Sequence, residues 1–133
     1  MHPADTEAAV IVMGCGPAGA GAALWLARRG IDVIVLDRGD EPGTRIESLP
    51  PDGIRLADEL GLAGAIDDST LGAVAEMQLY WRDLPEIRSF DADRAPLLLS
   101  KPGFHAAVRQ AVRDAGTRVF RRTIRSIAAG MDG

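Results

Sequence analysis

The sequence predicts an α/β fold built around one parallel βαβ unit, and three observations support this prediction. The pattern G-x-G-x-x-G runs from Gly14 to Gly19, between an apolar run at residues 8–13 and a helix-like stretch. A second apolar run, at residues 31–36, is followed by the acidic residue Asp37. Strand, glycine turn, helix, strand and acid in this order are typical of a site for an ADP moiety.

The other elements follow from the spacing of apolar residues and from punctuation by Gly and Pro. The first two strands are expected to be buried and joined by a right-handed crossover. Strands are predicted at residues 8–13, 32–36, 74–81, 87–90, 97–99, 118–121 and 123–128. Helices are predicted at residues 17–29, 52–60 and 102–115, with a turn or short helical piece at 64–70 and a loop at 39–51.

The residues of the glycine turn have distinct expected roles. Gly14 permits a sharp turn out of the first strand, and Gly16 permits close approach of a pyrophosphate. Gly19 lets the helix lie close against the strand, and Ala18 keeps that surface small. Pro17 suits the first helical position, where free N–H groups and the helix dipole favour anions. No Lys-Ser or Lys-Thr follows, which excludes an ATPase-type phosphate loop; a ligand-free glycine turn is the alternative.

Asp37 and Cys15, beside this turn, bear on which nucleotide binds and on whether the site contains a reactive group. Asp37 is expected to accept hydrogen bonds from the adenosine ribose, and its charge disfavours the 2′-phosphate of NADP, although Arg38 next to it leaves this open. Cys15 has two interpretations. It is either a reactive thiol with a lowered pKa near a helix N-terminus, or, as we favour, a small buried side chain beside the phosphates.

Composition narrows the class of protein. The chain has 133 residues, 47% hydrophobic, with a net charge of −4 and one cysteine. This length is enough for one core, and no uncharged apolar run reaches membrane length. The acidic balance gives no reason to expect nucleic acid or an anionic membrane as partner. One cysteine cannot form an internal disulfide, which is in keeping with the cytoplasm. No metal-ligating or Ser-His-Asp cluster stands out, so no catalytic residue is assigned.

Several motifs resemble one family. Residues 10–38, with G-C-G-P-A-G followed by L-A-R-R-G-I-D-V-I-V-L-D-R, resemble the N-terminal FAD-binding segment of flavin-dependent monooxygenases. Residues 45–51, R-I-E-S-L-P-P, continued by L-A-D-E-L-G-L, are similar to the branch with flavin-dependent halogenases and related maturation hydroxylases. Residues 98–122, with S-K-P-G-F-H-A-A-V-R-Q-A-V-R-D-A-G, resemble the helix that follows the substrate-strand insert.

The resemblance implies a Rossmann-like FAD-binding domain, incomplete in this chain, with the start of a β-rich substrate insert. FAD would be the cofactor and NAD(P)H the reductant of the longer enzyme. The pyrophosphate would lie on the three glycines, the ribose on Asp37, and Arg38 along the adenine. The implied parts are a βαβ core with a flavin loop at residues 8–60, an insert at 72–100, and a returning helix and strands at 101–129.

The resemblance also implies residues beside the flavin. Glu47 and Ser48, preceded by Arg45, match the loop that family members place there, although Ile46 stands where the family often has glycine. Lys101 stands where many relatives have an arginine that reaches the cofactor. A lysine there can still meet phosphate or flavin oxygen, without the fork of arginine. The alternative for Lys101 is a solvated residue at a helix start.

Hydroxylation is favoured over halogenation. Tryptophan-type halogenases share a lysine in the strand region that follows the Glu-Ser loop. In this chain the corresponding region is residues 73–81, and it contains no lysine. Tyr80 and Trp81, in that region, either line a substrate pocket or, as we favour, pack in a core or cover an edge strand.

The chain lacks two parts that such monooxygenases need, a downstream Gly-Asp segment on the FAD and a substrate sheet. Asp132 and Gly133 form a favoured hairpin pair, so the strand predicted at 123–128 lacks its return partner. We therefore expect the N-terminal part of a longer cytoplasmic enzyme, inactive alone and requiring a C-terminal half, acting on a small-molecule or peptide-borne aromatic substrate. The alternatives are an NAD-binding module of a dehydrogenase and a non-catalytic remnant.

Overall fold

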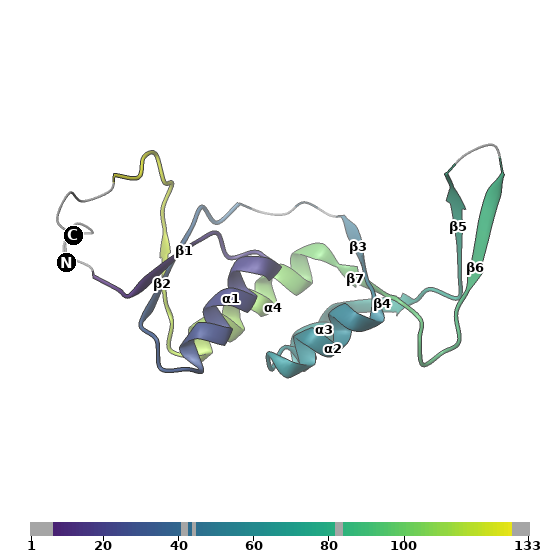
Figure 1. Cartoon of the computed structure of the whole chain (residues 1–133), viewed down its shortest axis with the longest axis horizontal. Coiled ribbons are helices and arrows are strands. Elements are labelled where there is room, and N and C mark those ends of the chain that lie inside the picture. Colours follow the sequence, from purple (N-terminus) through teal and green to yellow (C-terminus); the bar gives the residue numbers. More distant parts are fainter. Residues whose placement is uncertain (1–6, 41–42, 44, 82–83, 129–133) are drawn as a thin grey trace. The chain divides into compact units, whose positions relative to one another are not determined.

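The computed structural model describes residues 7–40, 43, 45–81 and 84–128 (Figure 1). The chain divides into two compact units. Unit 1 comprises residues 1–40 and 108–133, and unit 2 comprises residues 41–107. The boundary falls within one helix, α4 (Lys101–Asp114). None of the helices formed by the described residues is long and apolar enough to cross a bilayer.

Unit 1 contains the predicted βαβ motif. β1 (Val10–Met13) leads into α1 (Pro17–Ala27), and β2 (Val33–Asp37) follows. β8 (Arg118–Arg121) completes a parallel sheet with the order β1-β2-β8. The α/β class and the parallel pairing of the first two strands are therefore confirmed.

The core of unit 1 lies between α1, α4 and the central strand. Val33, Ile34 and Val35 of β2 are buried, and so are small or aliphatic residues of the two helices: Ala20, Ala23, Leu24, Val108 and Val112. Each buried aliphatic side chain contributes about 1.5–3 kcal/mol. The prediction of a buried first strand was wrong, because Ile11 and Met13 are 54% and 57% exposed. Among the strands of the described residues, β1 pairs only with β2, and its side chains alternate between the two faces of the sheet.

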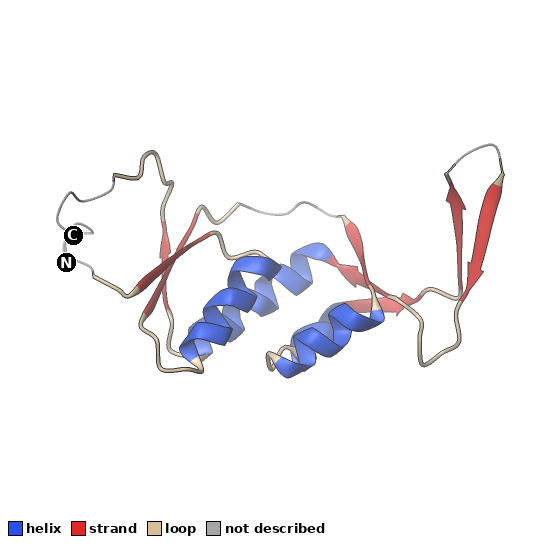
Figure 2. Ribbon diagram, viewed as in Figure 1, coloured by secondary structure: helices blue, strands red, loops and turns tan. Residues whose placement is uncertain are grey.

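Unit 2 is built from antiparallel strands and short helices (Figure 2). β3 (Ile46–Leu49), β7 (Leu97–Ser100) and β4 (Thr70–Ala73) form one sheet with β7 in the centre. β5 (Glu76–Tyr80) and β6 (Pro85–Ser89) form a separate hairpin. The helices are α2 (Pro51–Glu59) and α3 (Ala63–Ser69), and the buried residues include Leu62, Ile66, Leu99 and Phe104.

The helices and most strands lie within a few residues of the predicted positions, and three predictions need correction. The predicted loop at residues 39–51 contains β3, which pairs with β7. β4 was not predicted, because its sequence T-L-G-A has no alternating pattern. Residues 123–128 form no strand, because no described strand pairs with them. The predicted hairpin turn at residues 132–133 lies outside the described residues.

Candidate functional site

The glycine turn connects β1 to α1, and the start of the helix packs closely against the backbone of the turn. Gly14 has φ +95°, a conformation that side chains disfavour, and its N–H donates to the carbonyl oxygen of Leu36 at 2.8 Å. A Cβ at Gly19 would lie 2.1 Å from the Gly14 carbonyl oxygen. The predicted roles of Gly14 in the turn and of Gly19 in close helix–strand packing are therefore confirmed.

The N-terminus of α1 is open to an anion. Gly16 is the N-cap residue with extended backbone, and Pro17 takes the first helical position as predicted. No side chain caps the helix start by a hydrogen bond to its N–H groups. The first turn of α1, which begins with Pro17 and Ala18, contains no acidic residue. The free N–H groups and the positive end of the helix dipole therefore remain available for a phosphate group.

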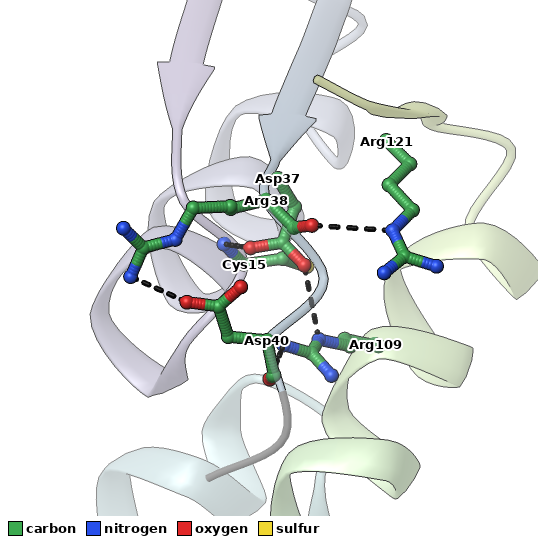
Figure 3. Close-up of polar contacts among 6 residues, drawn as sticks. All are labelled: Cys15, Asp37, Arg38, Asp40, Arg109 and Arg121. Carbon is green, nitrogen blue, oxygen red and sulfur yellow. Dashed lines mark hydrogen bonds and ion pairs between the residues drawn. The ribbon is translucent and has the colours of Figure 1, made fainter. Parts of the chain in front are cut away.

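Asp37 ends β2 and is held from two sides (Figure 3). Its Oδ1 accepts a hydrogen bond from the backbone N–H of Cys15 at 3.1 Å. Its Oδ2 lies 3.2 Å from Nε of Arg109, an ion pair in which the two side chains are 15% and 17% exposed. Arg109 also donates from NH2 to the carbonyl oxygen of Asp40 at 3.2 Å. The carboxylate is thus oriented by the glycine turn and by α4 together.

Arg38 lies on the outer side of this carboxylate. It forms an exposed ion pair with Asp40 at 2.5 Å, of the kind that adds little stability. Its carbonyl oxygen accepts from Nε of Arg121 at 3.3 Å. The chain then turns at Gly39, with φ +77°, where a Cβ would meet the Arg121 side chain at 3.0 Å.

A pocket of about 360 Å³, here named the strand-edge pocket, opens beside Asp37. It collects the carboxyl ends of β1 and β2 and the segment after β8, which is the edge where parallel sheets bind ligands. Its volume is in the range of small-molecule pockets. Its lining residues are Met13, Gly14, Leu36, Asp37, Arg38, Asp40, Arg109, Arg122, Thr123 and Ile124.

Cys15 is fully buried within the turn. Burial raises the pKa of its thiol, Asp37 raises it further, and Arg109 and Arg113 only partly offset this. The thiol is therefore protonated near neutral pH. This contradicts a reactive thiol of lowered pKa and confirms the buried side chain.

The other predicted cofactor residues belong to unit 2. Lys101, at the start of α4, and Glu47 form an ion pair at 2.5 Å, with side chains 20% and 42% exposed. The backbone N–H of Lys101 donates to the carbonyl oxygen of Arg45 at 3.0 Å. Glu47 and Ser48 lie in β3, opposite β7, rather than in a loop. Ile46, at the position of the family's glycine, is 60% exposed.

The structure brings Gly14, Asp37 and Arg38 together in unit 1, and Arg45, Glu47 and Lys101 together in unit 2. Sequence reasoning missed Arg109. The available signal was its place in a predicted helix beside buried Val108. Tyr80 and Trp81 are 72% and 73% exposed, which contradicts core packing. Among the residues that the structure describes, no group of three or more His, Cys, Asp or Glu is placed to hold a metal ion.

Comparison with known proteins gives the family. A family model described as "FAD binding domain" matches residues 7–124. The menaquinone reductase of Mycobacterium tuberculosis (strain CDC 1551 / Oshkosh) is 31% identical over 125 residues, 87% of this chain and 29% of that protein. A flavin-dependent monooxygenase of Mycobacteroides abscessus is 37% identical over 73 residues, 53% of this chain and 15% of that protein.

Solved structures share the fold. The peptidyl tryptophan dihydroxylase QhpG superposes with a TM-score of 0.67 at 26% identity, covering 94% of this chain and 27% of that one. The chain spans 15–29% of the length of the curated relatives that it matches. The family match covers most of the chain, and the resemblance to FAD-dependent monooxygenases is confirmed. The chain belongs to the FAD-binding domain family.

Proposed function

We propose that unit 1 binds the ADP part of FAD, and that the chain supplies the N-terminal cofactor-binding part of a flavin-dependent monooxygenase. The observation that carries the proposal is the carboxylate of Asp37, oriented beside an uncapped helix start at the carboxyl edge of a parallel sheet. This arrangement offers an acceptor for the ribose and donors for the pyrophosphate within one unit.

The residues of unit 1 fit the ADP moiety. The N–H groups at the start of α1, after Gly14 and Gly16, would donate to the pyrophosphate oxygens, with Pro17, Ala18 and Gly19 forming the close-packed surface. A carboxylate has about four lone-pair sites, so Asp37 retains capacity for ribose hydroxyls beyond its contacts with Cys15 and Arg109.

The same carboxylate favours an unphosphorylated ribose. A 2′-phosphate beside Asp37 would place like charges together, which costs binding free energy. This supports FAD over NADP at the site.

For unit 2, we propose from the family resemblance that Glu47, Ser48, Arg45 and Lys101 lie near the flavin. The ion pair between Lys101 and Glu47 would hold the lysine in one orientation. When bound, FAD supplies hydride acceptance and activation of oxygen. No residue of this chain is assigned as a catalytic acid or base.

We propose further that NAD(P)H is the reductant and that the substrate is a small-molecule or peptide-borne aromatic compound. We also propose a cytoplasmic location and completion of the flavin site by residues outside this chain. The likeness to a peptidyl tryptophan dihydroxylase supports a peptide-borne aromatic substrate. A second candidate is reduction of a quinone, favoured by the 31% identity to a menaquinone reductase over 87% of the chain.

Titration of the 133-residue chain with FAD and with NAD tests the cofactor proposal. Quenching of flavin fluorescence should be saturable with FAD, and excess NAD should not displace it. Gly16→Val is the matched variant, because φ −75° at residue 16 suits any side chain while the added bulk blocks the phosphates. Displacement by NAD at equal concentration, or unchanged FAD affinity in this variant, would contradict the proposal.

A further inference from the structure

A second pocket in unit 1 is lined by three arginines, and we name it the arginine pocket. It has a volume of about 270 Å³ between the end of β2, α4 and β8, and it shares Asp37 and Arg109 with the strand-edge pocket. Its lining residues are Asp37, Gly39, Arg109, Arg113, Val119, Phe120 and Arg121. The shared pair makes Asp37 and Arg109 a common wall of the two pockets.

The charges around the arginine pocket do not balance. Three guanidinium groups face one carboxylate, that of Asp37, so in this pocket positive charge outweighs the repulsion between Asp37 and a phosphate. The neighbouring pocket, where a 2′-phosphate would lie, is lined by two carboxylates, Asp37 and Asp40. Nε of Arg109 is buried and has no hydrogen-bond partner among the described residues, although Asp37 lies 3.2 Å away. Within the described part of the chain, Arg113 forms no ion pair, and the guanidinium of Arg121 donates only from Nε, to the carbonyl oxygen of Arg38. The guanidinium N–H donors that line the arginine pocket therefore outnumber the side-chain oxygen atoms that could accept from them.

We propose that the arginine pocket binds a phosphate group, separate from the pyrophosphate at α1. Guanidinium groups bind phosphate with paired, charge-assisted hydrogen bonds, and three of them match a dianion with several acceptor oxygens. The pocket is smaller than typical sites for drug-sized ligands, which suits a small anion rather than a nucleotide. Val119 and Phe120 supply an apolar wall, so a phosphate monoester with a small apolar group also fits.

The experiment is calorimetric titration of the 133-residue chain, without FAD, by inorganic phosphate and by phenyl phosphate at constant ionic strength. Both should bind saturably. Arg113→Gln should weaken binding about tenfold or more, because it removes a charge-assisted donor. Arg125→Gln is the matched control, since it removes an equal charge at an exposed position outside the pocket, and binding should change less than about twofold.

The two probes distinguish the sources of the phosphate. If the chain binds phenyl phosphate more tightly than inorganic phosphate, the ligand is a phosphate monoester. If the two affinities are equal, the ligand is free phosphate. The proposal is overturned if neither probe binds more than chloride does, if the two variants weaken binding equally, or if malonate binds as tightly as phosphate. A separate FAD titration distinguishes the two proposals, because FAD binding without phosphate binding removes only this one.

Discussion

Gly19→Ala tests how closely α1 must pack against the first strand. A Cβ at residue 19 would lie 2.1 Å from the Gly14 carbonyl oxygen and 3.4 Å from Cγ1 of Val12, whereas real Cβ contacts essentially never fall below 3.0 Å. The helix must therefore move by most of an ångström. Because the obstructing atom is backbone, the cost lies at the upper end of overpacking, about 3 kcal/mol. Alanine has a helix propensity about 1 kcal/mol more favourable than glycine, so the expected net loss in the free energy of unfolding is about 2 kcal/mol.

Urea unfolding followed by far-UV circular dichroism measures this loss, and a thermal scan should show a midpoint lower by roughly 6–10 °C. Gly64→Ala is the control, because it also lies in a helix and a Cβ there meets nothing within 4 Å. That control should be neutral or stabilised by up to about 1 kcal/mol. Wild-type stability in Gly19→Ala would refute the close packing of α1 against the glycine turn.

Three further predictions concern charge. The wild-type chain should bind ADP at least about tenfold more tightly than ADP carrying a 2′-phosphate, because Asp37 repels the added phosphate. Asp37→Asn should reduce this ratio of dissociation constants, which competition with a fluorescent nucleotide measures. Because burial raises the pKa of Cys15, the folded chain keeps a proton that the unfolded chain releases. Stability should therefore fall as the pH rises above about 8.5, and less steeply in Cys15→Ala; equal slopes in denaturation at several pH values would contradict this. A double-mutant cycle with Glu47→Gln and Lys101→Gln should give a coupling below about 1 kcal/mol, since both side chains reach solvent; a larger value would indicate a drier site.

The βαβ motif and the glycine turn could be predicted because their signals are local. The steric requirement at Gly19, the helix start at Pro17 and the strand of Val33–Asp37 all follow from neighbouring residues. Burial of β1 could not be predicted in the same way. An apolar run has the same sequence whether one face or both faces of the strand are covered, and Ile11 and Met13 lie exposed.

Features that depend on distant pairing were missed. β3 forms because residues 46–49 pair with β7, about 50 positions later, and no local pattern in R-I-E-S-L-P-P indicates this. Arg109 reaches Asp37 because α4 packs beside the end of β2, across a sequence separation that spacing rules do not cover. The segment 123–128 contains three β-branched residues, Thr123, Ile124 and Ile127, but it has no described neighbour to pair with and stays irregular.

Amide chemical shifts of the ¹⁵N-labelled chain during an ADP titration test the central claim most directly. Binding at the glycine turn should move the resonances of Gly16, Ala18 and Gly19 saturably and together, because their N–H groups lie at the helix start that receives the pyrophosphate. Leu79, in the β5–β6 hairpin of unit 2, should not respond. Absence of these shifts at millimolar ADP, or shifts confined to unit 2, would contradict the assignment of the cofactor site.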